Sequence, residues 1–267
     1  MSARRLFVRS ERGDASIPTA VRVFNCAVAF LLIALVFYLV FYFSYGRRLY
    51  HWDWKSVYRY RHLFLKGWGI TIRISLVSLV LSTFIGLAFA LARRSRFLPL
   101  SYASRIYVEL VRGTPLLVQI LIFFYIVADA FHVENRYFVG ILILSFFEGA
   151  YISEIIRAGI ESIGQSQIES AKAIGLTRPQ TYRYVIVPQA LRQTLPPMAG
   201  QLVSLIKDSS LLSIIAINEF TQSAQQANSY TYSTIECFLP LAIGYLMLTL
   251  PISIWTRWLE QRHQYET

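Results

Sequence analysis

The chain has 267 residues, of which 55% are hydrophobic and only 15% are charged, and its mean hydropathy is +0.45. This composition excludes an ordinary soluble domain, because a soluble protein of this size carries a larger share of charged side chains. The formal net charge is +11. A strongly basic balance occurs in nucleic-acid-binding proteins and also in membrane proteins with basic cytoplasmic loops.

Apolar runs long enough to cross a bilayer recur along the chain. A helix needs roughly 20 apolar residues to span about 30 Å of hydrocarbon, and Val23–Ser44 contains no charge. A signal peptide would be shorter and would end in small residues, whereas Phe41 to Tyr45 are bulky, so we expect this run to be retained. Five more candidates follow, at Gly69–Ala92, Tyr107–Ala128, Tyr137–Ala158, Leu195–Ile217 and Cys237–Thr256. These runs are apolar on every face, which predicts an all-α polytopic membrane helical bundle and not a β-barrel.

The basic residues indicate how the spans are oriented. If the amino terminus is cytoplasmic, 17 of the 26 Lys and Arg residues fall in inside loops and helix ends. By the positive-inside rule this distribution predicts that both termini are cytoplasmic, and it explains the net charge without a nucleic acid. Residues 46–66 depart from the rule as a basic outer loop. Because Trp and Tyr are interleaved with its basic residues, we expect this loop to rest at the headgroups of membrane lipids.

A polar insert separates the fourth and fifth predicted spans. Capping boxes that start at Ser166 and Thr177 predict two helix starts. Gly175 is expected to end the first helix, because glycine reaches the left-handed conformation without a Cβ penalty. Pro179 fits the first turn of the second helix. The first helix is too short to be stable alone, and we expect it to expose Ile168, Ala171, Ala173 and Ile174.

This insert resembles the EAA signature of bacterial ATP-binding cassette (ABC) transporter permeases. The signature reads EAA, three residues, Gly, nine residues and IxLP, and the matching anchors are Glu169, Ala171, Gly175 and Pro188. The departures are Ser170 for Ala, Val185 for Ile and Val187 for Leu. The resemblance implies that a coupling segment, residues 166–188, docks on a cytoplasmic ABC ATPase dimer through Glu169, Ser170, Ala171, Ala173, Ile174, Gly175 and Pro188. In the alternative interpretation, Glu169 only caps a helix and the loop folds back on the protein.

Three further segments are similar to the polar amino acid uptake subfamily of these permeases. They are VELVRGTPLLVQ (108–119), EGAYISEIIRAGI (148–160) and SLIKDSSLLSIIAINEFT (204–221). The resemblance covers about residues 67–260 and implies a five-helix importer core. The domains expected are therefore a cytoplasmic tail at 1–22, an extra transmembrane helix at 23–45, the outer loop at 46–66, the permease domain at 67–260 and a second tail at 261–267.

The resemblance also implies partners and a location. They are a second permease subunit, identical or related, an extracytoplasmic solute-binding protein, an amino acid substrate that is polar or charged, and the lipid of the bacterial inner membrane. The sequence has no GxxxxGK[ST] phosphate loop, so we expect no ATPase activity in this chain, and ATP and Mg would be bound by the partner subunit. The four histidines lack HxxxH or HExxH spacing, so no metal site is expected.

Ionisable residues inside the predicted spans are candidates for the substrate pathway. Glu148 lies in the fourth span with Tyr151 on its face, and Lys207 and Asp208 lie in the fifth. Gly113, Thr114 and Pro115 predict a broken helix, which in transporters lines a cavity, and Gln119 follows them. Pro196 and Pro197 suit a helix start, and Pro251 suits a kink. Glu148 either contacts the substrate's amino group or cationic side chain, or only pairs with Lys207.

Other classes of protein remain open from the sequence. An ion-coupled secondary transporter would use Glu148 as its proton or sodium carboxylate, although no inverted repeat is visible. An intramembrane enzyme would need a nucleophile and a base in register, and no such pair is placed convincingly. An export permease of the same superfamily is a further alternative.

Overall fold

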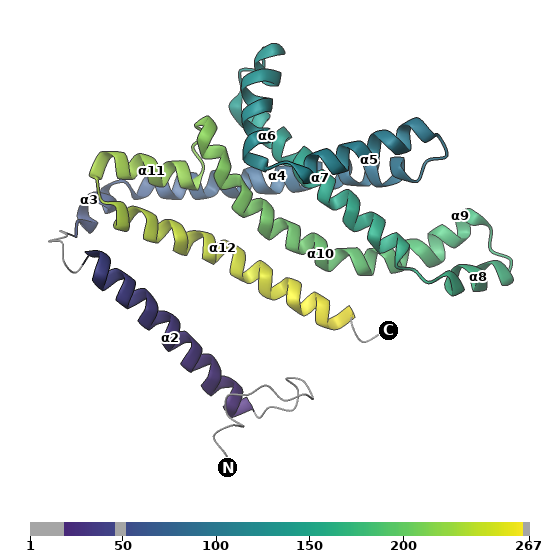
Figure 1. Cartoon of the computed structure of the whole chain (residues 1–267), viewed down its shortest axis with the longest axis horizontal. Helices are drawn as coiled ribbons and strands as arrows, with labels where there is room; N and C mark the ends of the chain where they lie inside the picture. Colours follow the sequence, from purple (N-terminus) through teal and green to yellow (C-terminus); the bar gives the residue numbers. More distant parts are fainter. Residues whose placement is uncertain (1–18, 46–51, 264–267) are drawn as a thin grey trace. The chain divides into compact units, whose positions relative to one another are not determined.

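The computed structural model describes residues 19–45 and 52–263, and every regular element within them is helical (Figure 1). The contacts divide the chain into two units, 1–52 and 53–267. In the first unit lies α2 (Thr19–Tyr45). The elements of the second unit are α3 (Trp54–Arg59), α4 (Arg61–Arg93), α5 (Leu98–Gly113), α6 (Leu116–Ile122), π-helix η2 (Phe123–Ala128), α7 (Arg136–Glu161), α8 (Gln165–Ala173), α9 (Arg178–Thr181), π-helix η3 (Tyr182–Ile186), α10 (Val187–Asp208), 3₁₀-helix η4 (Ser209–Ile215), α11 (Phe220–Thr231) and α12 (Thr234–His263).

The helical membrane bundle predicted from the sequence is confirmed. Within the described residues, five helices are long and apolar enough to cross a membrane, or six if one bent pair counts as a span. They include α2, α4, α7 and α12, and a helical run from Arg178 to Ile215. The chain therefore crosses a membrane several times.

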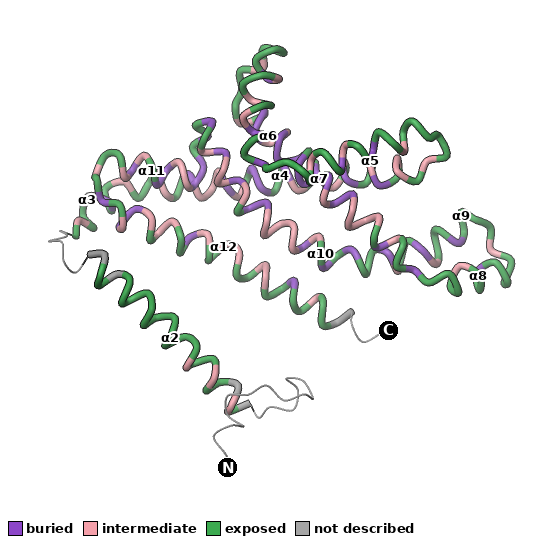
Figure 2. Tube along the Cα trace, in the orientation of Figure 1, coloured by how far each residue is buried: buried purple, intermediate pink, exposed green. Residues whose placement is uncertain are grey.

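The packing of the second unit is built on the contact between α4 and α7. Apart from Ile74, the buried face of α4 carries small side chains, namely Gly67, Thr71, Ser75, Ser78, Ser82, Gly86 and Ala90. Their spacing of three and four residues places them on one helical stripe. Gly67 and Thr71 meet the start of α11, and Gly86 meets Ile152 of α7. Small residues let two membrane helices approach closely, so that the helices make van der Waals contacts with each other in place of contacts with lipid. Figure 2 shows buried residues along this region, whereas the described residues of α2 are mostly exposed and none is buried.

The third predicted span, Tyr107–Ala128, is not one helix. It breaks between α5 and α6, and the two segments are bent by 109°. The reason is local, since Thr114 and Pro115 both have extended backbone torsions, with ψ of 144° and 137°. The predicted break at Gly113, Thr114 and Pro115 is thus confirmed, and the predicted span boundaries are wrong.

The fifth predicted span is longer than expected. The prediction that Pro196 and Pro197 start a helix is wrong, because both lie inside α10. The run that starts at α9 continues through η3 into α10 and η4. The two prolines leave the carbonyls one turn earlier without their usual donors, and in membrane helices neighbouring groups or water can satisfy such carbonyls. Pro251 likewise lies within the unbroken α12.

The segment expected as an outer loop at 46–66 also differs from the prediction. Residues 46–51 lie outside the described residues, and most of the remainder is helical, in α3 and the first turns of α4. Trp68 of α4 donates a hydrogen bond to the Gly244 carbonyl of α12, 3.3 Å away. This contact helps to explain why helical structure begins before the predicted span, as the turns next to Trp68 gain tertiary support.

Close packing of α4 on α7 makes a prediction about stability. A Cβ atom at Gly86 would lie 2.6 Å from Cγ2 and 2.8 Å from Cβ of Ile152, whereas one at Gly69, on the same helix, would meet nothing within 4 Å. We expect Gly86→Ala to destabilise the protein by about 1–3 kcal/mol, the usual cost of overpacking. Thermal unfolding of the detergent-solubilised protein, followed by Trp fluorescence, measures the effect. Gly69→Ala is the control, and equal midpoints for the two variants would contradict the packing argument.

Candidate functional site

The polar insert folds as a helical hairpin formed by α8 and α9. Helix α8 ends in a Schellman motif: the Leu176 N–H donates to the Ala171 carbonyl (3.0 Å) and the Gly175 N–H donates to the Lys172 carbonyl (2.9 Å). Gly175 has φ +82°, a conformation that glycine adopts without a Cβ penalty. The predicted end of this helix is confirmed.

The start of α9 is also as predicted. The Thr177 N–H donates to Oε1 of Gln180 (2.8 Å) in a capping box, and Pro179 lies in the first turn. The predicted capping box at Ser166 is wrong, because α8 starts at Gln165 with Gly164 as its N-cap and no side chain caps it. Ser166 therefore lies one residue inside the helix.

One face of α8 anchors it to the rest of the protein and the other is exposed. The prediction that Ala171 is exposed is wrong, since its exposed fraction is 3%, and Ile168 packs on a small core of Ile163, Ile186 and Ala190. The remaining predicted coupling residues are exposed, namely Glu169, Ser170, Ala173, Ile174, Gly175 and Pro188. Ile174 is 77% exposed. Together with the exposed Ala173 it makes the tip of the hairpin apolar.

The hairpin is linked to three of the long helices. Helix α9 runs on through η3 into α10, at whose start Pro188 lies. Tyr182 of η3 accepts a hydrogen bond at its hydroxyl from Arg94, which follows α4 (3.0 Å). Ile160 of α7 joins the same small core. The contacts of the hairpin therefore extend to α4, α7 and α10.

At its opposite end α10 carries Lys207 and Asp208, next to the buried Glu148 of α7. Glu148 has an exposed fraction of 1%, and its Oε2 atom has no hydrogen-bond partner within the described residues. The Asp208 carboxyl acts on it electrostatically, whereas Lys207 is exposed. The predicted pair of Glu148 with Lys207 is absent from the ion pairs of the described residues. The structure brings together two acids instead.

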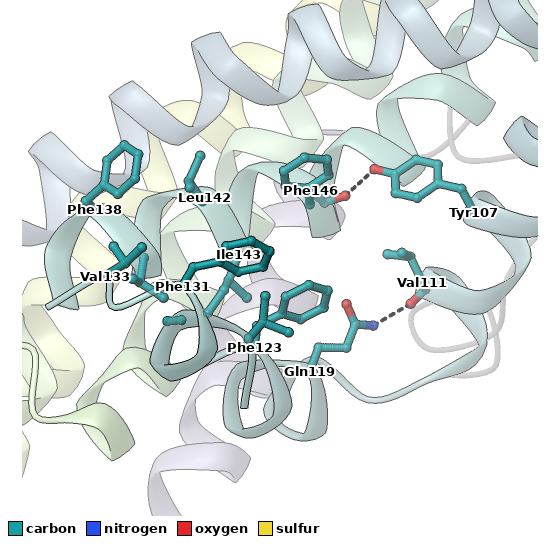
Figure 3. A pocket seen from close by; sticks show the side chains of 13 residues that line it. Tyr107, Val111, Gln119, Phe123, Phe131, Val133, Phe138, Leu142, Ile143 and Phe146 are labelled. Carbon is teal, nitrogen blue, oxygen red and sulfur yellow. Dashed lines mark hydrogen bonds between the residues drawn. The ribbon is translucent and has the colours of Figure 1, made fainter. Parts of the chain in front are cut away.

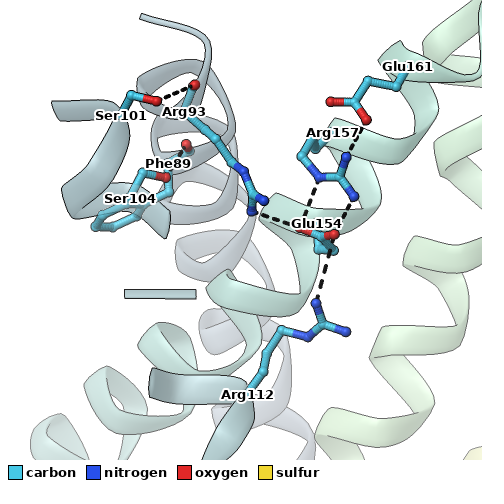
Figure 4. Close-up of polar contacts among 8 residues, drawn as sticks. All are labelled: Phe89, Arg93, Ser101, Ser104, Arg112, Glu154, Arg157 and Glu161. Carbon is cyan, nitrogen blue, oxygen red and sulfur yellow. Dashed lines mark hydrogen bonds and ion pairs between the residues drawn. The ribbon is translucent and has the colours of Figure 1, made fainter. Parts of the chain in front are cut away.

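A second ionic cluster on α7 was not anticipated from the sequence (Figure 4). Glu154 lies 3.2 Å from Nη1 of Arg93 on α4 and 3.9 Å from Nη1 of Arg112 on α5, and it also pairs with Arg157. Arg157 pairs in turn with Glu161. The cluster therefore ties α4, α5 and α7 together. Its signal in the sequence was the spacing of Glu154, Arg157 and Glu161, three and four residues apart on one helical face.

The cluster is connected to the residues around Glu148. The Arg112 guanidinium lies 5.4 Å from the centre of the Tyr151 ring, within the range of a cation–π contact. Tyr151 also packs on Phe147, with ring centres 5.2 Å apart. Tyr151, predicted to line the pathway, thus contacts Arg112 of α5 and lies about one helical turn after Glu148 on α7.

The helix break holds the other predicted pathway residues. Nε2 of Gln119 donates to the carbonyl oxygens of Val111 (2.8 Å) and Thr114 (3.1 Å) and to the Thr114 hydroxyl (2.8 Å). These bonds satisfy carbonyl groups that the break releases, as required at membrane depth. Gln119 is therefore a structural brace of the turn formed by Gly113, Thr114 and Pro115. A role of these four residues in the pathway stays a prediction.

Beside this brace lies a cavity of about 450 Å³ between α5, α6, η2 and α7 (Figure 3). Its walls are mainly apolar, including Phe123, Phe138, Ile143 and Phe146. The Tyr107 hydroxyl at its rim donates to the Phe146 carbonyl (2.5 Å). The Tyr107 hydroxyl and the Gln119 amide nitrogen already donate hydrogen bonds to the protein, so the cavity offers little to hold a polar solute.

Comparison with known proteins agrees with the geometry of the bundle and the hairpin. Residues 82–265 match the family model described as "Binding-protein-dependent transport system inner membrane component". The chain is 32% identical over 200 residues to the probable glutamine ABC transporter permease protein GlnM of Bacillus subtilis strain 168, covering 75% of this chain and 93% of that one.

Two further relatives extend the comparison. The glutamine transport system permease protein GlnP of Escherichia coli K12 is 32% identical over 212 residues, covering 79% of this chain and 97% of that one. A chain in a crystal structure of an amino acid ABC transporter with histidines is 31% identical, with a TM-score of 0.75, covering 80% of this chain and all of that one. The protein therefore belongs to the family of inner-membrane components of binding-protein-dependent transport systems, the permeases of ABC transporters.

Proposed function

We propose that this chain is the transmembrane permease subunit of an ATP-driven, binding-protein-dependent importer of amino acids. The observation that carries the proposal is the exposed α8–α9 hairpin, whose residue order matches the EAA signature and whose second helix continues into α10. The relatives with glutamine in their names and the solved amino acid transporter support the substrate class. No finding favours the alternative of an ion-coupled secondary transporter.

The partner at the hairpin is a cytoplasmic ABC ATPase dimer. Glu169, Ser170, Ala173 and Ile174 form the exposed face of α8 and its end, and they supply one charge, one hydroxyl and an apolar tip. Such a face fits a cleft that accepts an amphipathic helix. ATP and Mg bind to the partner subunits, so the hairpin receives their closure as a mechanical displacement.

The same displacement reaches the acidic pair through α10. The helical run from Arg178 to Ile215 has no break, so a push on α9 moves Asp208 relative to Glu148 on α7. Two permease subunits, identical or related, would enclose a path that alternates between the two sides of the membrane. The hairpin is then on the cytoplasmic side of a bacterial membrane, and the distribution of Lys and Arg along the sequence predicts that both termini are on that side as well. An extracytoplasmic solute-binding protein delivers the amino acid from the opposite side.

The acidic pair is suited to the ammonium group that every amino acid carries. Glu148 is buried within a span, beside a second carboxyl and without a basic partner among the ion pairs of the described residues. A negative group at this depth is costly unless a cation or a wet path accompanies it. A transported amino acid supplies the cation during its passage.

The hairpin geometry predicts how coupling can be lost. At Gly175, with φ +82°, valine is strained by roughly 1–2 kcal/mol or more, and Glu169→Lys reverses the charge of the exposed face. We expect both variants to insert into the membrane normally. The amount of substrate taken up per ATP hydrolysed should fall to less than about a tenth of the wild-type value, which corresponds to a loss of about 1.4 kcal/mol or more in docking free energy. The assay is ATP hydrolysis and uptake in proteoliposomes.

Gly164→Ala is the matched control, because this glycine has a negative φ and its nearest neighbour would lie 3.6 Å from the new Cβ. Its coupling ratio should equal that of the wild type. Fully coupled transport by both Gly175→Val and Glu169→Lys would contradict the docking role.

The acidic pair gives a second prediction. Glu148→Gln keeps the shape of the side chain but removes its capacity to ionise, so we expect at least about a tenfold loss in substrate-stimulated ATPase activity, comparable to the loss of one charged hydrogen bond. The measurement is stimulation of the reconstituted transporter by a panel of amino acids with the solute-binding protein. The exposed Glu109→Gln is the control. Unchanged affinity and unchanged substrate preference in Glu148→Gln would remove Glu148 from the site.

A further inference from the structure

A groove of about 700 Å³ lies between α3, the first turns of α4 and α12. Helix α4 begins at this groove with Arg61. At the other end of α4, Arg94 donates a hydrogen bond to Tyr182 beside the hairpin, so the groove and the hairpin lie at opposite ends of this helix. A 33-residue helix is about 50 Å long, so the groove and the hairpin face opposite sides of a membrane.

One wall of the groove is basic and aromatic. It contains Lys55, Tyr58 and Arg61, all of them exposed. The Arg61 guanidinium lies 4.3 Å from the centre of the Tyr58 ring and donates a hydrogen bond to the Tyr58 carbonyl (3.3 Å). These contacts hold the guanidinium at the groove. Within the described part of the chain no acidic residue lines the groove, so the groove itself presents two positive charges to an anion.

The other wall and the floor are apolar. Val57 is 6% exposed and packs on Ala227 and Cys237, while Leu65 is 69% exposed. Phe64 of α4 and Pro240 of α12 complete this side. Both helices are membrane spans, so the apolar side lies next to hydrocarbon and the basic side next to headgroups.

A ligand that fits both walls must be anionic at one end and apolar at the other. A free phosphate ion would use only the two cations and leave the apolar wall empty. An acidic protein surface would meet Lys55 and Arg61 but not the hydrocarbon-facing side chains. An anionic phospholipid satisfies both, with its headgroup at the height where aromatic and basic residues gather.

We propose that this groove is a binding site for an anionic phospholipid. The phosphate contacts Lys55 and Arg61, and an acyl chain lies on Phe64, Leu65 and Pro240. The lipid belongs to the leaflet opposite the hairpin. This site accounts for two of the basic residues that depart from the positive-inside rule, Lys55 and Arg61, because there they meet anionic headgroups instead of the cytoplasm.

The test is lipid binding by the purified full-length chain. The delipidated protein is titrated with phosphatidylglycerol or phosphatidylcholine, and bound lipid is counted by native mass spectrometry. We expect the double variant Lys55→Gln/Arg61→Gln to lose roughly thirtyfold in affinity for phosphatidylglycerol, the effect of removing two cation–headgroup contacts. The matched control is Arg59→Gln/Lys66→Gln, which removes the same charge from exposed residues outside the groove.

Equal losses in the two double variants would overturn the proposal, because a diffuse positive field would then explain binding. No loss in Lys55→Gln/Arg61→Gln would overturn it as well. Displacement of the lipid by an equal concentration of glycerol 3-phosphate would show a site for a soluble phosphate instead, since the acyl chain would contribute nothing.

A second measurement identifies the occupant without relying on a loss. A photoreactive benzophenone side chain replaces Leu65, and the full chain is irradiated in membranes that contain phosphatidylglycerol. An adduct with the mass of this lipid supports the proposal. An adduct to a peptide from residues 19–45, to a second copy of the chain or to the solute-binding protein would overturn it and name the true occupant.

Discussion

The arrangement of this protein depends on the close approach of α4 and α7. Lipid is as apolar as a leucine side chain, so helices in a bilayer associate through packing and not through removal of apolar surface from water. The stripe of Gly, Ser, Thr and Ala on α4 allows this packing. On α7, a Cβ atom added at Gly149 would lie only 2.7 Å from Cγ2 of Ile85 on α4. The position of α7, and of the acids that it carries, follows from this contact.

Two groups of charges are held on α7 in different ways. Glu154 is surrounded by arginines from three helices, so its charge is compensated within the chain. Glu148, nearly two turns earlier, faces Asp208 and has no such partner among the described ion pairs. The first group fixes helices relative to one another, whereas the second leaves a negative potential that a passing cation can use. This contrast separates a structural acid from a candidate site.

Much of the local structure was predictable because its causes are local. The ends of the hairpin followed from Gly175, Thr177 and Pro179, whose torsional and capping preferences act within a few residues. The break at Thr114 and Pro115 followed for the same reason. The predictions failed where tertiary packing was decisive: Pro196 and Pro197 lie inside α10 and not at its start, and Ala171 turns into the protein.

By itself the sequence determined the membrane location, the helical class, the family and the hairpin. These follow from apolar run length, charge distribution and short motifs, all of which are properties of neighbouring residues. Only the tertiary structure decided that Glu148 faces Asp208 and not Lys207, that Gln119 braces the helix break, and that Lys55 and Arg61 share a groove with Pro240. Such pairings join residues far apart in the chain, so they depend on how helices pack.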